Sequence, residues 1–314
     1  MYPGRVTRHK SQVAMTDKKQ ITTVSDGLLI RAPAKINLSL LIAGRRPNGF
    51  HEIETIMAKV DFLDELLIQK NLKPGMELIC KGPYEAPQGK ENIVYKACEI
   101  LLDSCGSEAD LKITLTKNVP AGAGLGSASS DAAAALIGLN QFLRLAVDKN
   151  KLVELAATLG SDVPFFLDGP LALCTGRGEK IRKLSENFNF LALLILPNIS
   201  VSTKKVYANY RHNSALYENL RGEINGLLQK NRIDLIVKMC TNMLETSCFS
   251  LYEGLAALKA KTEALGIGPL CLSGSGSGMF CIMDSAEQQR AQQYKTKLEE
   301  KLGCKTIIVR NNRW

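Results

Sequence analysis

The segment from residue 122 to residue 130 holds three glycines at alternate positions, Gly122, Gly124 and Gly126. Glycines let a backbone turn tightly and approach a ligand closely, and the helix-forming stretch that follows offers free N–H groups to an anion. The spacing matches neither of the two common nucleotide loops, because Ser127 stands where a last glycine would be and no lysine follows. The segment predicts a polyphosphate-binding loop. The alternative is a flexible loop with Ser129 or Ser130 capping a helix.

A second glycine run, residues 273–278, lies between two apolar segments about 150 residues later in the chain. By itself it could form a simple hairpin turn. Two glycine loops, each flanked by regular elements, favour their convergence on one phosphate chain.

Two side chains of opposite charge could take part in phosphoryl transfer. Asp162 stands before Val163-Pro164-Phe165-Phe166, where it could either cap a short helix or accept a proton from a substrate hydroxyl. Lys35 could be a solvated strand lysine or a cation that stabilises a carboxylate and the charge developing on a phosphate. The sequence alone leaves both alternatives open for each residue.

Metal-dependent hydrolysis and disulfide frameworks find no support. His51 is followed by Glu52, but residue 55 is Thr, so the metalloprotease pattern H-E-x-x-H is broken, and G-x-S-x-G does not occur. The nine cysteines form no C-x-x-C pair. Their odd number and wide spacing predict reduced, mostly buried thiols in a cytoplasm-like compartment.

The strands and helices that must position these residues follow one another in an irregular order. Apolar residues alternate from position 36 to 40, which places Lys35 and Asn37 on the same, polar face of a strand. We expect one strand to begin at residue 28 and further strands at 111–115, 171–174, 191–196, 270–272 and 279–283. We expect helices at 92–105, 132–145, 151–159, 224–239, 252–265 and 286–302. This order predicts an α+β fold with two lobes, over 29–172 and 173–314, after a basic and flexible leader at 1–28.

The net charge of +9 suggests at first a nucleic-acid or membrane-surface partner. Seven of these nine units lie in residues 1–28 and 301–314, so the body of the chain is nearly neutral. The longest apolar run, 190–196, is far shorter than the roughly 20 residues of a membrane span. We therefore expect no nucleic-acid and no membrane partner.

Four separated motifs together resemble the GHMP kinase superfamily of small-molecule kinases: Ala32-Pro33-Ala34-Lys35-Ile36-Asn37-Leu38, the Pro120–Ser130 loop, Gly160-Ser161-Asp162-Val163-Pro164 and the Ser273–Gly278 run. The segment Arg45-Arg46-Pro47-Asn48-Gly49-Phe50-His51 is similar to members whose substrate carries a cytidine diphosphate. The resemblance implies a two-lobed fold with an N-terminal ATP-binding lobe and a C-terminal substrate lobe. It also implies phosphorylation of the 2-hydroxyl of a cytidylylated methylerythritol in the non-mevalonate isoprenoid pathway.

The same resemblance implies roles for individual residues. Asp162 would be the catalytic base and Lys35 the cation beside it. ATP would be bound by Asn92, Lys117, Pro120, Ala121, Gly122, Ala123, Gly124, Leu125, Gly126, Ser127, Ala128, Ser129 and Ser130. The substrate would be bound by Asn37, Phe50, His51, Thr203, Tyr207, Gly274 and Gly276, with Phe50 and Tyr207 on the two faces of the cytosine. Mg²⁺ is expected to shield the phosphates, and Ser130 is the candidate ligand.

Other functions stay open. Another GHMP kinase would act on a mevalonate-type or homoserine-type substrate, but aromatic residues that stack on a base have no use for a substrate without one. A basic α+β protein that binds nucleic acid is a second alternative. We expect a cytoplasmic monomer or weak homodimer.

Overall fold

The structure is a computed structural model that describes residues 20–185 and 188–311. Its larger sheet has the strand order β1-β2-β3-β5-β4, with β6 beside β3, β7 beside β6 and β9 beside β2. These strands are β1 (Ile21–Val24), β2 (Gly27–Arg45), β3 (His51–Lys70), β4 (Met76–Lys81), β5 (Leu111–Thr116), β6 (Leu171–Gly176), β7 (Lys180–Lys183) and β9 (Thr241–Asn242). The smaller sheet is antiparallel throughout, in the order β10 (Cys271–Leu272), β11 (Met279–Asp284), β8 (Phe190–Leu196) and β12 (Lys305–Arg310).

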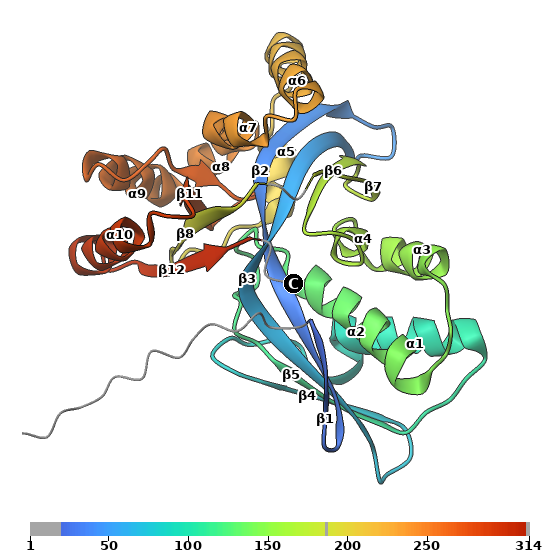
Figure 1. The fold of residues 1–314 in the computed structure, drawn as a ribbon. Helices are drawn as coiled ribbons and strands as arrows, with labels where there is room; N and C mark the ends of the chain where they lie inside the picture. Colours follow the sequence, from blue (N-terminus) through green and yellow to red (C-terminus); the bar gives the residue numbers. More distant parts are fainter. Residues whose placement is uncertain (1–19, 186–187, 312–314) are drawn as a thin grey trace, which may run out of the picture.

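The helices cover both sheets. They are η1 (Gly89–Glu91, a 3₁₀ turn), α1 (Ile93–Cys105), α2 (Ser127–Leu143), α3 (Lys149–Leu159), α4 (Val163–Phe166), α5 (Thr203–Asn209), α6 (Ser214–Gln229), α7 (Ile233–Met239), α8 (Glu245–Leu251), α9 (Glu253–Ala264) and α10 (Gln288–Leu302). Helices α1 to α4 lie on one side of the long strands β2 and β3, and the smaller sheet with α8 to α10 lies on the other (Figure 1). The mixture confirms the expected α+β class.

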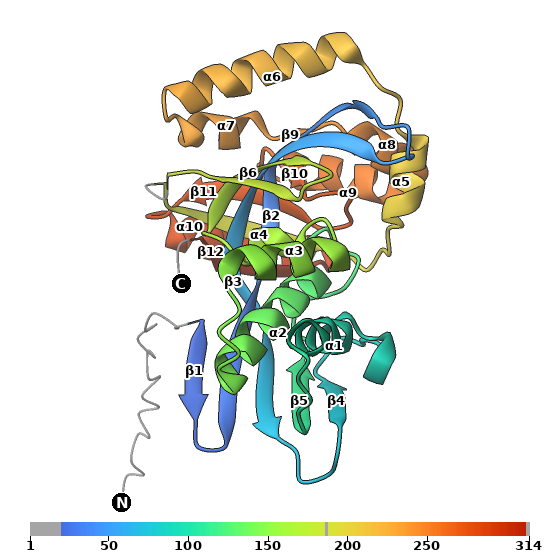
Figure 2. The same cartoon turned by 90° about the vertical axis from the view of Figure 1, so that its right-hand side faces the viewer.

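The long hairpin of β2 and β3 connects the two lobes. Its lower half pairs with β1 and β5, and its upper half pairs with β6 and β9, as the side view shows (Figure 2). The pairing of β2 with β3 slips at three places, one of them between Asn37 and Ser39. Such bulges increase the local twist and re-aim side chains. Both faces of β2 are covered along residues 32–42, so Lys35, Asn37 and Ser39 are buried rather than solvated.

Two local differences from the sequence-based expectations concern segment ends. Residues 21–24 form β1 and pair with β2, so the leader expected to be flexible through residue 28 already has ordered structure there, while residues 1–19 lie outside the described residues. The β-branched residues of Ile-Thr-Thr-Val favour this strand. The expected boundary between residues 172 and 173 falls inside β6, and the chain first enters the smaller sheet after β7.

A third difference is the helix expected over 224–239, which is two helices in the structure. Helix α6 ends at Gln229 and α7 begins at Ile233, with Asn231 between them in the left-handed conformation (φ 54°). Asparagine tolerates this conformation better than most residues. The apolar pattern continues across the break, which is why periodicity alone does not reveal it.

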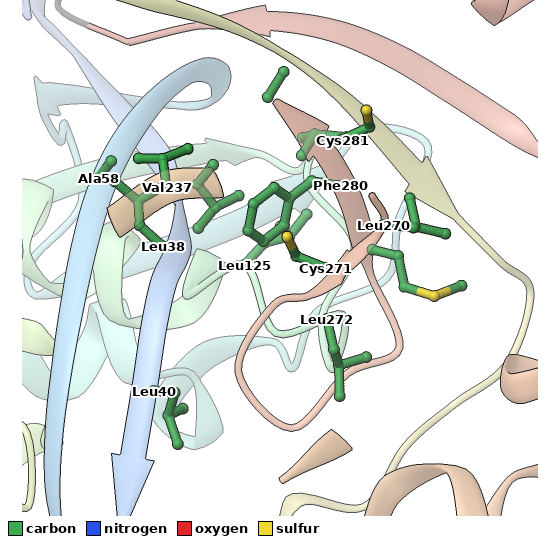
Figure 3. Packing of buried hydrophobic residues seen from close by; sticks show 14 of the residues in the cluster. Leu38, Leu40, Ala58, Leu125, Val237, Leu270, Cys271, Leu272, Phe280 and Cys281 are labelled. Carbon is green, nitrogen blue, oxygen red and sulfur yellow. The ribbon is translucent and has the colours of Figure 1, made fainter. Parts of the chain in front are cut away.

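The core lies in two clusters. One cluster fills the space between the lower half of the hairpin and α1 to α4, and the other joins the upper half to the smaller sheet. Figure 3 shows the second cluster, where Leu125 from the first glycine loop is packed with Leu38, Val237 and Phe280. None of the helices in the described segments is both long and apolar enough to cross a bilayer.

One cysteine pair corrects the expectation that all thiols are free. Cys240, at the end of α7, forms a disulfide with Cys271 at the start of β10, and their Cα atoms lie 5.2 Å apart. The remaining seven cysteines are free thiols. Sequence spacing could not reveal this pair, because 31 residues separate its members and only the packing of α7 near β10 brings them together.

Candidate active site

A cavity of about 780 Å³ collects most of the candidate residues. The sequence-based candidates that line it are Lys35, Asn37, Phe50, His51, Pro120, Ala121, Gly122, Gly124, Leu125, Gly126, Ser127, Ala128, Ser129, Asp162, Thr203, Tyr207 and Gly274. They come from the hairpin, the first glycine loop, α4, α5 and the second glycine loop. A single cavity therefore unites segments that are up to about 240 residues apart in the sequence.

The two glycine loops are in direct contact, as their shared chemistry suggested. Ser273 Oγ donates a hydrogen bond to the Gly124 carbonyl (2.9 Å), and the Gly278 N–H donates to the Ala123 carbonyl (3.1 Å). A Cβ atom on Gly124 would lie 1.9 Å from the Ser273 carbonyl oxygen, so only glycine fits at this position. The second loop also joins β10 to β11 as a hairpin. The expected hairpin turn is confirmed, and the convergence of both loops on one phosphate chain stays a prediction.

The first glycine loop leads into α2, whose N-cap is Gly126 in the left-handed conformation (φ 66°). This conformation is strained for residues with a side chain, and a Cβ atom there would lie 2.9 Å from Lys35 Cγ. The first N–H groups of α2 have no partner within the helix. Because Ser127 to Ser129 line the cavity, this helix start can bind a phosphate group.

Lys35 contacts the loop and the hairpin at once. Its side chain is 4% exposed, and its Nζ donates to Asn37 Oδ1 (2.6 Å) and to the Gly124 carbonyl (2.9 Å). Asn37 in turn donates to Thr55 Oγ1 (2.8 Å). Burial lowers the pKa of Lys35 from its ordinary value, and the neighbouring Asp162 acts in the opposite direction. The lysine is thus held in place by three partners at the edge of the cavity.

Asp162 lies beside Lys35 in the lining of the cavity. Asp162 Oδ2 lies 3.6 Å from Lys35 Nζ, and the Asp162 side chain keeps 33% of its surface exposed. Asp162 stands at the N-cap position of α4, but its side chain makes no capping hydrogen bond. The alternative that this carboxylate serves as a helix cap is therefore wrong. An exposed carboxylate beside a buried cation can accept a proton from a bound hydroxyl.

Aromatic rings line the other end of the cavity. The rings of His51 and Tyr207 lie 5.1 Å apart, and Tyr210 contacts His51 edge-on at 5.9 Å. Phe50 is 51% exposed, which is unusual for so large an apolar side chain. Burial lowers the pKa of His51 and raises that of Tyr207, so both rings are favoured in their neutral forms. This end of the cavity suits a flat heterocycle.

Five sequence-based candidates do not line the cavity: Asn92, Lys117, Ala123, Ser130 and Gly276. Asn92 is buried and accepts the Val94 N–H at the start of α1. Ser130 Oγ is buried without a hydrogen-bond partner in the described residues.

Lys117 lies in a buried ionic cluster behind the first glycine loop. Its Nζ contacts Asp64, Ser127 and Asp131, the last at 2.6 Å. Burial raises the pKa of Asp131 to about 8, and the pKa of Lys117 is raised by its two carboxylates against the effect of its burial. The cluster connects β3 to the start of α2. It therefore supports the loop from behind.

The sequence reasoning missed a group of cations. The cavity is also lined by Arg45, Arg177, Lys204 and Arg211, whereas Asp162 is the one carboxylate among its described lining residues. Such an excess of positive charge attracts anionic ligands. Arg45 was visible only as part of a motif, and the others lie in turns or at a helix start, where a charged residue is ordinary.

Comparisons with known proteins agree with this geometry. Residues 92–170 match the family model described as "GHMP kinases N terminal domain", and residues 224–301 match "GHMP kinases C terminal". A 4-diphosphocytidyl-2-C-methyl-D-erythritol kinase of Geobacter metallireducens is 36% identical over 84% of this chain and 92% of its own length. A protein of the same name from Clostridium botulinum is 33% identical over 87% of this chain and 96% of its own.

Solved structures resemble the fold as a whole. A crystal structure of 4-(cytidine 5'-diphospho)-2C-methyl-D-erythritol kinase aligns with a TM-score of 0.70 at 30% identity, covering 90% of this chain and 99% of the other. A homoserine kinase from Cytophaga hutchinsonii aligns with a TM-score of 0.72 at 21% identity, covering 93% and 96%. At that identity the second likeness concerns the fold alone.

Proposed function

Because the chain belongs to the GHMP kinases and, within them, to the family of 4-diphosphocytidyl-2-C-methyl-D-erythritol kinases, we propose that 4-diphosphocytidyl-2-C-methyl-D-erythritol is its substrate. The chain is an ATP-dependent small-molecule kinase of the isoprenoid pathway. The observation that carries the choice of substrate is that one cavity joins the glycine loop, the Lys35–Asp162 pair and the Phe50–His51–Tyr207 end.

The proposed reaction is one phosphoryl transfer. The oxygen of the substrate's 2-hydroxyl forms a bond to the γ-phosphorus of ATP, the bond from that phosphorus to the β–γ bridging oxygen breaks, and ADP leaves with the electron pair. Asp162 accepts the proton of the hydroxyl, and the ammonium of Lys35 stabilises the charge that develops on the transferred group. Lys35 suits this role because Asn37 and the Gly124 carbonyl already orient its Nζ.

The triphosphate would lie along the first glycine loop, with the N–H groups at the start of α2 directed at its oxygens. Asn92 and Lys117 are proposed near the nucleotide, Lys117 as a support beneath the loop rather than a direct contact. Ala123, which is buried, belongs to the same loop.

Mg²⁺ would neutralise charge on the phosphates. Among residues 20–185 and 188–311, no group of three or more His, Cys, Asp or Glu side chains could hold a metal ion. Magnesium in kinase sites keeps several waters and is held by substrate phosphates with one or two protein ligands. The unpartnered Oγ of Ser130 is the proposed hydroxyl ligand.

The cytidine diphosphate would occupy the aromatic end. The cytosine would stack between Phe50 and Tyr207 and form hydrogen bonds with His51, whose lowered pKa favours the neutral imidazole. Thr203, whose Oγ1 lies 2.8 Å from Ser275 Oγ, and Asn37 are proposed as polar contacts, with Gly274 and Gly276 shaping the second loop around the substrate. The cavity cations Arg45, Lys204 and Arg211 suit the negative charge of the diphosphate.

ADP release measured with purified protein, ATP and magnesium tests the proposal. We expect turnover with 4-diphosphocytidyl-2-C-methyl-D-erythritol and none with mevalonate or homoserine. Turnover with only one of the two control substrates would overturn the substrate assignment and leave the kinase class standing. A steep salt dependence of tight binding to generic RNA, without turnover of any small molecule, would instead favour a nucleic-acid partner.

A further inference from the structure

One arginine in the cavity contacts the exposed ring of Phe50. Arg177 lies in the turn between β6 and β7, and its guanidinium carbon is 5.1 Å from the centroid of the Phe50 ring. Both residues line the cavity. In the described part of the chain the Arg177 side chain forms no ion pair with a carboxylate, so the ring is its principal partner.

The turn that carries Arg177 is itself held in place. The Glu179 carboxylate accepts a hydrogen bond from the backbone N–H of Arg177 (2.6 Å), so the carboxylate restrains the turn rather than the guanidinium. Gly178 lies beside the proposed base, since a Cβ atom there would be 3.5 Å from Asp162 Oδ1. The same turn therefore lies near Asp162 at Gly178 and contacts Phe50 through Arg177.

Phe50 needs such a contact because the chain around it offers little else. Its ring is half exposed at the end of the loop between β2 and β3, and its backbone N–H donates only to Asn48 Oδ1 (3.2 Å). A cation over one face of a ring attracts the ring and leaves the opposite face open for stacking. The contact favours one orientation of this half-exposed ring.

We propose that Arg177 is a positioning residue that holds the Phe50 ring as a platform for the nucleobase of a cytidine-diphosphate substrate. This inference rests on the proposed function. It assigns Arg177 to base recognition through Phe50 and not to direct contact with the diphosphate. The two roles predict different results when the Phe50 ring is removed. If Arg177 positions the ring, its substitution then has no further effect on substrate binding. If Arg177 contacts the diphosphate directly, its substitution still weakens binding.

A double-mutant cycle separates these roles. The variants are Arg177→Gln, Phe50→Leu and their combination, with Arg177→Lys as the charge-conserving form. Arg182→Gln is the matched control, since Arg182 is an exposed arginine of the same hairpin that does not line the cavity. Calorimetry measures the affinity for CDP, and steady-state kinetics measures KM and kcat for the cytidylylated substrate.

We expect Arg177→Gln to weaken CDP binding and to raise KM by about fivefold, the size of one cation–π contact of roughly 1 kcal/mol, with a smaller effect on kcat. In the Phe50→Leu background the same substitution should have no further effect. Arg177→Lys should retain part of the affinity, and Arg182→Gln should behave as wild type. Thermal unfolding checks that every variant is folded.

Three results would overturn the proposal. An unchanged CDP affinity in Arg177→Gln would show that the contact has no role in binding. An equal loss in the Phe50→Leu background would assign Arg177 to the diphosphate instead. Failure of the wild-type protein to bind CDP and to turn over the cytidylylated substrate would overturn the proposed function as well, which distinguishes this result from the first two.

Discussion

Lys35 Nζ and Asp162 Oδ2 lie 3.6 Å apart, although 127 residues separate them along the chain. The lysine is buried and the carboxylate is one-third exposed, so the pair presents its acidic partner to the cavity. The charges are close enough to support each other, and the distance leaves the carboxylate free to bind another hydrogen-bond donor. The proposed chemistry is centred on this pair.

Asp162→Ala should abolish detectable turnover while ATP still binds. Removal of a general base costs about 10²- to 10⁴-fold in rate, and loss of the positioned carboxylate adds to this. Rapid-quench measurement of ADP formation and a separate ATP titration check the two parts. Asp148→Asn, at the N-cap of α3 and outside the cavity lining, is a control for general loss of an acidic residue. Wild-type rates in the Asp162 variant would remove it from the base role.

Gly124→Ala should unfold more easily than Gly122→Ala. Both glycines have φ near 71°, so both substitutions carry the left-handed strain of about 1–2 kcal/mol. Only at position 124 would the new Cβ collide with a backbone carbonyl, that of Ser273, while nothing lies within 4 Å at position 122. Chemical denaturation measures the free energy of unfolding of both variants, and the difference between them gives the destabilisation caused by the collision. Equal losses of stability would contradict the contact between the two loops.

The buried carboxylate Asp131 predicts a pH dependence of stability. Its pKa is raised from 3.8 to about 8 in the folded state, so the folded state binds an extra proton between these values. The resulting stabilisation is complete below about pH 4 and is lost as the pH rises through about 8. Wild type should therefore lose stability relative to Asp131→Asn over this range. Urea unfolding of both proteins at several pH values measures the difference, and a constant difference would exclude the raised pKa.

The Cys240–Cys271 disulfide predicts that reduction changes both the mass of the protein and its free energy of unfolding. Intact protein prepared without reductant should weigh less than reduced protein by two hydrogen atoms. Reduction should lower the free energy of unfolding by about 4 kcal/mol, because the bond closes a loop of 31 residues. The effect of reduction should vanish in Cys240→Ser and persist in Cys105→Ser, a free thiol elsewhere. Identical masses before and after reduction would contradict the pairing.

Local patterns were sufficient wherever a short segment decides its own structure. The helix over 92–105 was predictable from the spacing of its apolar residues and from Gly106, which ends α1 in the left-handed conformation. Alternation around Lys35 and Asn37 placed the two side chains on one face, and their 2.6 Å hydrogen bond confirms that face. The motifs also brought the glycine loops and Asp162 into one kinase site before any geometry was known.

Tertiary structure alone decided what depends on residues distant in sequence. Residue types and their spacing determined the fold class and the family, because these depend on local backbone preferences and on motif order. The burial of Lys35, the Cys240–Cys271 bond and the contact of Arg177 with Phe50 were decided by the packing of segments that lie far apart in the sequence. The physical reason is that burial and side-chain contact are properties of neighbours in space, and neither charge nor spacing along one segment specifies which neighbours the fold will supply.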